Sequence, residues 1–218
     1  MKYAIFSDIH NNDQALARVL QHAAERSIDR YLCLGDVGTD PSVTLVRNVG
    51  AETVFGNWEV SGWGYLSAKY QDHVLRWPPL RKYDGFWIGH ASPNWPDNID
   101  QLEQFLKNRH RMGLAAAFPY YIHQSEALWR AFATLLEAKI SCFFHGHTHL
   151  QAVWTLTSDN CLRKTRPEIL ELSPEDTYII GVGSVGQPRD STQPSYVIYD
   201  TASAQVQFVS VDGDGPVK

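Results

Sequence analysis

The chain has 218 residues, of which 44% are hydrophobic and 20% are charged, and its net charge is −5 at pH 7. This length allows one sizeable domain with its own core, and the composition is that of an ordinary soluble globular protein. The negative charge argues against a broad surface for nucleic acid or acidic membranes, and no apolar run approaches the length of a membrane span.

The first quarter of the chain alternates between strand and helix. Its short apolar runs predict strands at 2–7, 30–35 and 52–56. Between them, the apolar positions of 11–27 fall on one helical face, with Asn11 as the candidate N-cap. The segment 41–50 predicts a short helix with Gly50 beyond its end. This order is typical of a parallel sheet covered by helices.

The middle of the chain is less regular and rich in aromatic residues. A strand is predicted at 86–91, and 97–139 has a mostly helical pattern. We interpret the segments near 60–85 and 95–135 as helical and aromatic caps on a single domain that spans residues 1–218. Core packing is the alternative explanation for these aromatic residues.

The last third returns to β character. Strands are expected at 140–146, 152–157, 177–183, 195–200 and 204–211. The stretch "GVGSVG" at 181–186 fits a glycine-rich dinucleotide fingerprint, but the residues after it cannot open a helix, so we interpret it as a turn.

The chain contains three cysteines, Cys33, Cys142 and Cys161. An odd number without a Cys-x-x-Cys pair predicts neither a disulfide framework nor a zinc site. Reduced thiols of this kind are typical of a cytoplasmic protein.

Polar side chains follow five of the predicted strands, at the point where each strand ends. Seven of them can bind a metal ion: Asp8, His10, Asp36, Asn57, His90, His147 and His149. Glycine precedes four of these exits and permits tight turns. Each residue alone has a structural explanation, such as a turn cap for Asp36 or a core position for His90. Five such exits in chain order indicate one site, because ligands of open α/β sheets bind at the carboxyl ends of the strands.

The set of two Asp, one Asn and four His is too large for one tetrahedral zinc ion. It suits two octahedral ions that share a carboxylate. Two ions about 3.5–4 Å apart are a standard arrangement for phosphoester hydrolysis. Mixed nitrogen and oxygen ligands accept Mn, Fe, Zn, Co or Ni.

The motifs "DIH", "GDVG", "GNWE", "GH" and "GHTH", in this order, resemble those of the calcineurin-like metallophosphoesterase family. The tail "VGSVGQPRD" followed by "SYVIYD" resembles its small, single-domain prokaryotic branch. The resemblance covers about 1–210 and is weakest in the two cap segments. It implies an α/β fold, a four-layer α/β/β/α sandwich, with two divalent transition-metal ions at the sheet edge, and it favours Mn or Fe.

The resemblance also implies a role for each ligand. The first ion would be held by Asp8, His10 and His149, and the second by Asn57, His90 and His147. Asp36 would bridge them, and a hydroxide shared by both ions would attack phosphorus in line with the leaving oxygen. Asp36, Asn57 and His90 are the expected catalytic residues. His145 matches no ligand position and is expected behind the ligands or hydrogen-bonded to the backbone.

The chain departs from the family pattern at Trp58. The family commonly has a histidine there, which is thought to protonate the leaving group or to contact the phosphate. An indole N–H cannot act as an acid, so Trp58 is a candidate to stack on an aryl group or base of the substrate. Glu59 is a possible substitute acid. Arg189 is either a surface ion-pair partner or a phosphate contact.

These observations favour a dinuclear metal-dependent phosphoesterase that hydrolyses a phosphomonoester or phosphodiester. Its substrate would be a small phosphorylated molecule, such as a nucleotide or an aryl phosphoester, or a phosphoprotein. The alternative is a non-catalytic scaffold or binding protein on the same fold, against which the seven filled ligand positions argue. A DNA-repair nuclease is disfavoured by the negative charge and by the lack of a basic patch. Metal identity, substrate and oligomeric state stay open.

Overall fold

The computed structural model describes residues 1–108, 113–121 and 125–212. Its first sheet has the strand order β3-β2-β1-β11-β12-β9. The strands of this sheet are β1 (Lys2–Phe6), β2 (Arg30–Cys33), β3 (Glu52–Thr53), β9 (Ile169–Glu171), β11 (Ser195–Asp200) and β12 (Gln205–Ser210). As predicted, β1, β2 and β3 run parallel. The sheet is mixed, however, because β11 pairs antiparallel with β1.

The second sheet has the order β4-β5-β6-β10-β7-β8. Its strands are β4 (Leu80–Lys82), β5 (Phe86–Gly89), β6 (Cys142–His145), β7 (Gln151–Leu156), β8 (Leu162–Thr165) and β10 (Thr177–Val182). The central strands β5, β6 and β10 are parallel, and β4 and β7 pair antiparallel on either side of them.

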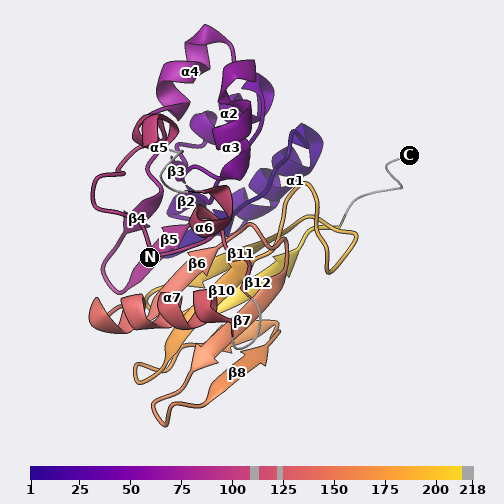
Figure 1. Cartoon of the computed structure of the whole chain (residues 1–218). Coiled ribbons are helices and arrows are strands. Elements are labelled where there is room, and N and C mark those ends of the chain that lie inside the picture. The colour runs from indigo at the N-terminus through magenta and orange to yellow at the C-terminus, as the bar shows by residue number, and fades with distance from the viewer. Residues whose placement is uncertain (109–112, 122–124, 213–218) are drawn as a thin grey trace.

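Helices cover the outer faces of both sheets. They are α1 (Asp13–Ala24), α2 (Asp40–Asn48), α3 (Asn57–Gly62), the 3-10 helix η1 (Trp63–Tyr65), α4 (Ala68–Val74), α5 (Leu102–Asn108), α6 (Leu114–Ala117) and α7 (Glu126–Glu137). In Figure 1 the helices α2 to α5 gather above the sheets, whereas α7 lies across the lower sheet. None of the described helices is long and apolar enough to cross a membrane.

Three apolar clusters separate four layers. Ile5 and Leu32 of the first sheet pack against Phe144 and Ile180 of the second, between the two sheets. Strand alternation turns the neighbouring side chain, Phe143, to the opposite face, where it packs against α7. A third cluster joins the first sheet to α1 and α2. These layers confirm the predicted four-layer α/β/β/α sandwich.

Several local predictions were wrong. Asn11 does not cap α1, because its backbone is left-handed (φ 63°) and its side chain accepts a hydrogen bond from the Thr39 amide. Asn12 is the cap, and its Oδ1 accepts from Ala15 N at 3.1 Å. The predicted strand 52–56 shortens to two residues, and β4, β8 and β9 were not predicted. Within 97–139 three separate helices form, and 109–112 and 122–124 lie outside the described residues.

Candidate metal centre

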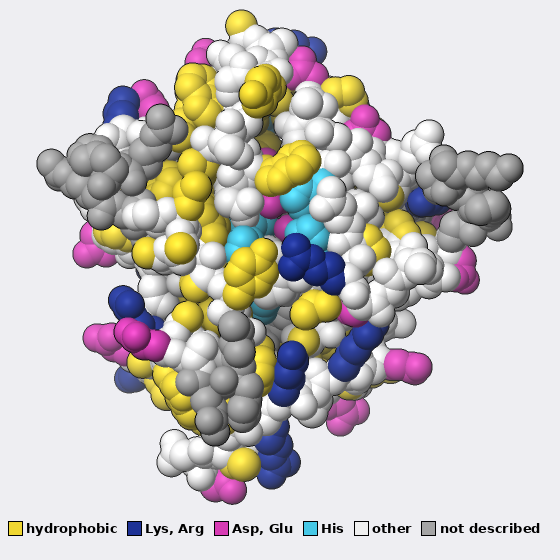
Figure 2. All heavy atoms as spheres, turned by 45° about the vertical axis from the view of Figure 1, so that its right-hand side comes forward, with side chains coloured by type: hydrophobic (Ala, Val, Ile, Leu, Met, Phe, Trp, Pro, Cys, Tyr) yellow, Lys and Arg dark blue, Asp and Glu magenta, His cyan; other side chains and the backbone are white. Residues whose placement is uncertain are grey.

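The carboxyl ends of β1, β2 and β3 from one sheet and of β5 and β6 from the other meet at one place. Two groups of side chains there have potential metal-binding atoms within 4.8 Å of one another, Asp8–His10–His149 and Asp8–Asp36–His90. Figure 2 shows the histidines gathered in a hollow, with acidic atoms between them and a basic side chain directly below. The fold therefore brings the predicted strand exits together, although from two sheets.

Most of the predicted ligands have a left-handed backbone. Positive φ angles of 49–61° are found at Asp8, His10, Asp36, His147 and His149. Non-glycine residues rarely adopt this conformation, and when they do they cluster at functional sites. Here the conformation turns each side chain sharply out of its strand end toward the common centre.

Two glycines are required by close approach. A Cβ on Gly56 would overlap the Asp36 carboxylate. A Cβ on Gly146 would overlap the Ser7 hydroxyl and lie 2.6 Å from Asp8 Oδ2. The glycines at these strand exits therefore make room for the two carboxylates.

Asp8 is the centre of the first group. Its Oδ1 lies 3.3 Å from His149 Nε2 and 3.7 Å from His10 Nε2. The two imidazole nitrogens are themselves 3.2 Å apart. The backbone amide of His147 donates to Asp8 Oδ2 at 3.0 Å and so orients the carboxylate.

Asp36 belongs to the second group and also lies close to His10 of the first. Its Oδ2 is 3.6 Å from His10 Nε2 and 3.5 Å from His90 Nε2. The Oδ1 atom of Asn57 lies 3.1 Å from the same nitrogen of His90. His147 belongs to neither tight group, but its ring centroid is 5.2 Å from that of His90.

Hydrogen bonds determine the tautomers of two histidines. His90 Nδ1 lies 2.7 Å from the Leu34 carbonyl oxygen, and His149 Nδ1 lies 2.7 Å from the Gln187 carbonyl oxygen. A carbonyl can only accept, so each Nδ1 carries the proton. In the neutral ring, Nε2 then presents a lone pair to the centre, as a metal ligand requires.

The charges and lone pairs of the centre fit a divalent cation. Asp8 and Asp36 are buried, and among the described residues their ion-pair partners are all histidines. Burial raises the pKa of Asp36 well above its ordinary value, and the Glu59 and Asp8 carboxylates raise it further. Burial lowers the pKa of His147 to about 3, and its buried Nε2 has no hydrogen-bond partner. Carboxylates without a cation and an imidazole without a partner are what bound metal would satisfy.

Glu59 has a role that the sequence did not reveal. Its buried carboxylate accepts hydrogen bonds from three backbone amides, those of Asp36 (2.9 Å), Val37 (2.8 Å) and Gly56 (2.7 Å). The side chain thus joins the exits of β2 and β3, and it does not serve as a free acid. Its position three residues after the N-cap Gly56 is the capping-box signal that could have suggested this.

Two aromatic rings of the second cap segment border the centre. The ring centroid of Tyr120 lies 4.3 Å from that of His147, and the centroid of Phe118 lies 5.7 Å from that of His90. No periodic pattern ties these residues to a strand end, so sequence reasoning missed them.

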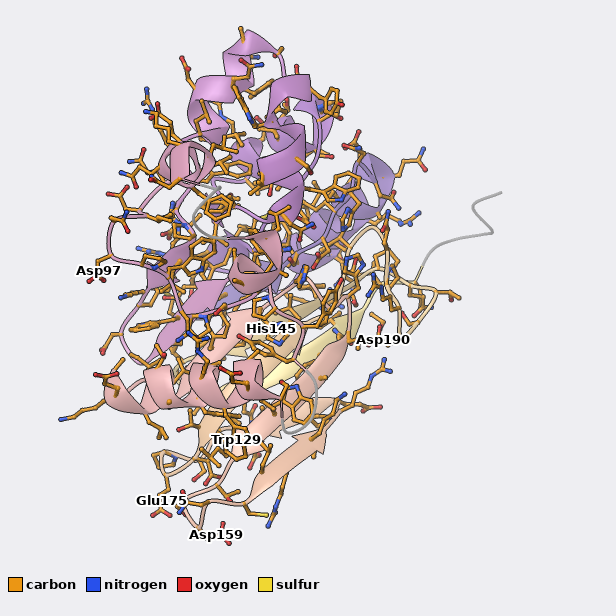
Figure 3. All side chains as sticks on the ribbon, viewed as in Figure 1. Asp97, Trp129, His145, Asp159, Glu175 and Asp190 are labelled. Carbon is orange, nitrogen blue, oxygen red and sulfur yellow. The ribbon has the colours of Figure 1, made fainter. Side chains whose placement is uncertain are left out.

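The remaining predicted residues lie around the centre. The Trp58 ring stands edge-on to the His10 ring, with centroids 4.2 Å apart. The backbone amide of Trp58 donates to Asp36 Oδ1 at 2.7 Å. Arg189 is exposed, and its amide donates to the His149 carbonyl. His145 is buried behind the ligands, with its Nδ1 2.9 Å from the Gly146 carbonyl oxygen (Figure 3).

Comparison with known proteins places the chain in one family. The chain is 26% identical over 223 residues to an uncharacterized protein of Methanocaldococcus jannaschii, covering 97% of this chain and 87% of that protein. A metallophosphoesterase from Sphaerobacter thermophilus has a similar crystal structure, with a TM-score of 0.73 and 27% identity over 97% of this chain and 89% of that one.

A hypothetical protein from Pyrococcus horikoshii shares the fold, with a TM-score of 0.62 and 13% identity over 98% of this chain and 88% of that one. The family model of the calcineurin-like phosphoesterase superfamily domain matches residues 1–204. The chain therefore belongs to the calcineurin-like phosphoesterase superfamily.

Proposed function

We propose that the protein is a metal-dependent phosphoesterase that uses two divalent ions. The observation that carries this proposal is the pair of buried carboxylates, Asp8 and Asp36, with histidine nitrogens around them and no Lys or Arg partner among the described residues. Such a donor set has little structural use without cations, because burial of unpaired carboxylates is costly.

Each ligand has a place in this proposal. Asp8, His10 and His149 would hold one ion and Asn57, His90 and His147 the other. The position of Asp36 Oδ2, almost equidistant from His10 and His90, supports its assignment as the shared ligand. When bound, two such ions stabilise charge on the phosphoryl oxygens and lower the pKa of a water molecule. Manganese or iron is our favoured occupant, with zinc, cobalt and nickel as alternatives.

The protein's own side chains then orient the reacting groups. Asn57 Oδ1 and His90 Nε2, 3.1 Å apart, both present lone pairs next to Asp36, as two ligands of one ion would. The exposed Arg189 side chain, which follows the loop that holds His149, is our candidate phosphate contact. Trp58 cannot supply a proton, and both oxygens of Glu59 accept from backbone amides. We therefore expect a phosphoester whose leaving group departs readily without a proton.

The proposal extends to the domain organisation of the chain, its location in the cell and its partners. We propose a single domain, with the segments near 60–85 and 95–135 as caps beside the centre. Phe118 and Tyr120 of the second segment border its histidines, and Trp58, directly before the first segment, contacts His10. The three cysteines are free, which supports a cytoplasmic location. Nucleic acid is an improbable partner for a chain with a net charge of −5.

The test is metal dependence. The purified protein should carry up to about two transition-metal ions per chain by elemental analysis. It should hydrolyse 4-nitrophenyl phosphate or bis(4-nitrophenyl) phosphate, lose this activity with a chelator and regain it with Mn²⁺. A protein that binds no metal and hydrolyses neither ester in any metal would instead be a non-catalytic member of the superfamily.

A further inference from the structure

A small apolar pocket adjoins the candidate metal centre. It has a volume of about 80 Å³ and lies between the α3–η1 segment and the loops that follow β1 and β2. Its aromatic and aliphatic walls are Trp58, Trp63, Tyr65 and Leu66. In Figure 2 hydrophobic side chains border the histidines directly above the hollow. We name this cavity the aromatic pocket.

Trp58 connects the aromatic pocket to the centre. Its ring is a wall of the pocket and also contacts His10 edge-on, with centroids 4.2 Å apart at an angle of 87°. The residue before it is the candidate ligand Asn57. A group bound in the pocket is therefore one side chain away from the metal ligands.

The carboxylate of Glu59 and the amide oxygen of Asn11, which line the pocket, already have partners. Both oxygens of Glu59 accept backbone amides. Asn11 Oδ1 accepts from the Thr39 amide at 2.7 Å. What remains for an occupant is an uncharged surface in which three aromatic rings predominate, and this suits a flat, mostly apolar group.

The outer wall of the pocket is more exposed than packing alone explains. Tyr65 is 86% exposed, and Trp63 is only partly buried against the core. No heavy atom lies within 4 Å of where a Cβ on Gly64 would be, so the chain between these two rings is not tightly packed. Exposed aromatic rings beside a candidate active site are typical of a binding surface.

We propose that the aromatic pocket binds an aromatic ring of the substrate, so that the enzyme selects phosphoesters that carry such a ring, aryl or nucleoside, over those that carry none. This inference rests on the proposed phosphoesterase function and adds its substrate class. An aryl group and a nucleobase offer the same flat π-surface to Trp58, Trp63 and Tyr65. An aryl leaving group also departs without a proton, which fits a centre with Trp58 in place of an acid.

The experiment measures binding without hydrolysis. Phenylphosphonate and methylphosphonate share the anionic group and differ in the ring, and neither can be cleaved as an ester. Titration calorimetry on the Mn²⁺-loaded protein should give a dissociation constant roughly 10-fold lower for phenylphosphonate. Tyr65→Ala should remove most of this difference, and Tyr65→Phe should retain it. Because the Tyr65 side chain is exposed, neither variant threatens the fold.

Trp129→Ala is the matched control. Trp129 is also an exposed aromatic residue, but it lies on α7, far from α3 (Figures 1 and 3). This variant should keep the full preference for phenylphosphonate. Adenosine monophosphate and ribose 5-phosphate are cleavable monoesters, so a comparison of their kcat/KM values identifies the source of the ring. A preference for the nucleotide indicates a nucleobase, and a preference limited to phenylphosphonate indicates an aryl group.

The outcomes separate the two proposals. If both phosphonates bind with equal affinity, the aromatic pocket is not a subsite, although the phosphate site stands. If neither they nor inorganic phosphate bind to the metal-loaded protein, the proposed phosphoesterase function fails, and the substrate class fails with it.

Discussion

The residues of the centre are held in costly backbone conformations by their surroundings. The left-handed backbones of Asp8, His10 and Asp36 each cost about 1 kcal/mol or more. These conformations persist because backbone and side-chain hydrogen bonds hold them in place. The Asp36 carbonyl accepts from the amides of both Ile9 and His10, and the Ser184 hydroxyl donates to the Asp8 carbonyl. The side chains are thus positioned before any ion binds, which lowers the cost of assembling the site.

The first prediction concerns the proposed shared ligand. Asp36 Oδ2 is close to both His10 and His90, whereas the imidazole Nε2 of His149 lies close to Asp8 and His10 of the first group. Asp36→Asn should therefore weaken binding of both ions, and His149→Ala should leave about one ion per chain in place. Elemental analysis after dialysis against a fixed Mn²⁺ concentration measures this. Selective loss of the same single ion in both variants would refute the assignment of Asp36.

A second prediction concerns Glu59. In Glu59→Gln one carboxylate oxygen becomes an NH₂ group that faces backbone donors, so at least one buried amide loses its acceptor. The free energy of unfolding should fall by about 2–3 kcal/mol, as measured by urea denaturation. The control is Glu126→Gln, which removes an exposed ion pair with Arg130 and should change stability by less than about 0.5 kcal/mol. Equal midpoints for both variants would show that the three hydrogen bonds of Glu59 do not support the fold.

At the scale of elements, the junction between β3 and α3 is the tightest part of the site. Gly56 lies between β3 and the first residue of α3, and a Cβ there would overlap the Asp36 carboxylate. Its φ of −110° is open to any residue, so the restriction is purely steric. Gly56→Ala should destabilise the protein by about 1–3 kcal/mol and reduce its metal content. Gly64→Ala meets no atom within 4 Å and should be neutral or slightly stabilising in the same thermal melt. Identical melts would mean that the junction relaxes easily.

Much of this arrangement was predictable, because each strand that supplies a ligand gives two sequence signals, an apolar run and a polar residue soon after it. The strands β1, β5 and β6 are mostly buried runs, β2 becomes buried in its second half, and a polar ligand follows each of them within a few residues. The apolar run predicts which segment forms a buried strand. The polar residue after it predicts which side chains meet at the edge of the sheet. The strand β8 was missed because its sequence "LRKT" is mostly exposed at a sheet edge.

The contacts that were not predictable are long-range. Glu59 reaches amides 22 and 23 residues away, and Tyr120 lies against His147 from a segment without strand or helix pattern. The shift of the N-cap from Asn11 to Asn12 has a similar cause, since Asn11 bonds to Thr39 in a loop 28 residues away. Local propensity cannot report such partners, because tertiary structure selects them.

At the scale of the whole molecule, the centre joins the two sheets. Asp8, Asp36 and Asn57 follow strands of the first sheet, whereas His90 and the "HTH" segment follow strands of the second. The apolar layer between the sheets brings these ends together, and the buried carboxylates of Asp8 and Asp36 repel each other there. Bound cations would turn this repulsion into attraction between the sheets.

The last prediction follows from that reversal of sign. Ions that bind only the folded chain stabilise it by mass action, and Mn²⁺ at about 100 times its Kd adds ~2.7 kcal/mol for each site it fills, or roughly 5–10 °C in Tm per site for a chain of this size. Asp36→Asn should differ from the wild type both without and with metal. Without metal its Tm should exceed that of the wild type, because a buried like charge is gone and the Asn oxygen can still accept the Trp58 amide. With Mn²⁺ its Tm should rise far less than that of the wild type. Calorimetric scans with chelator and with Mn²⁺ measure all four values, and a metal-free variant less stable than the wild type would show that repulsion between Asp8 and Asp36 does not limit stability.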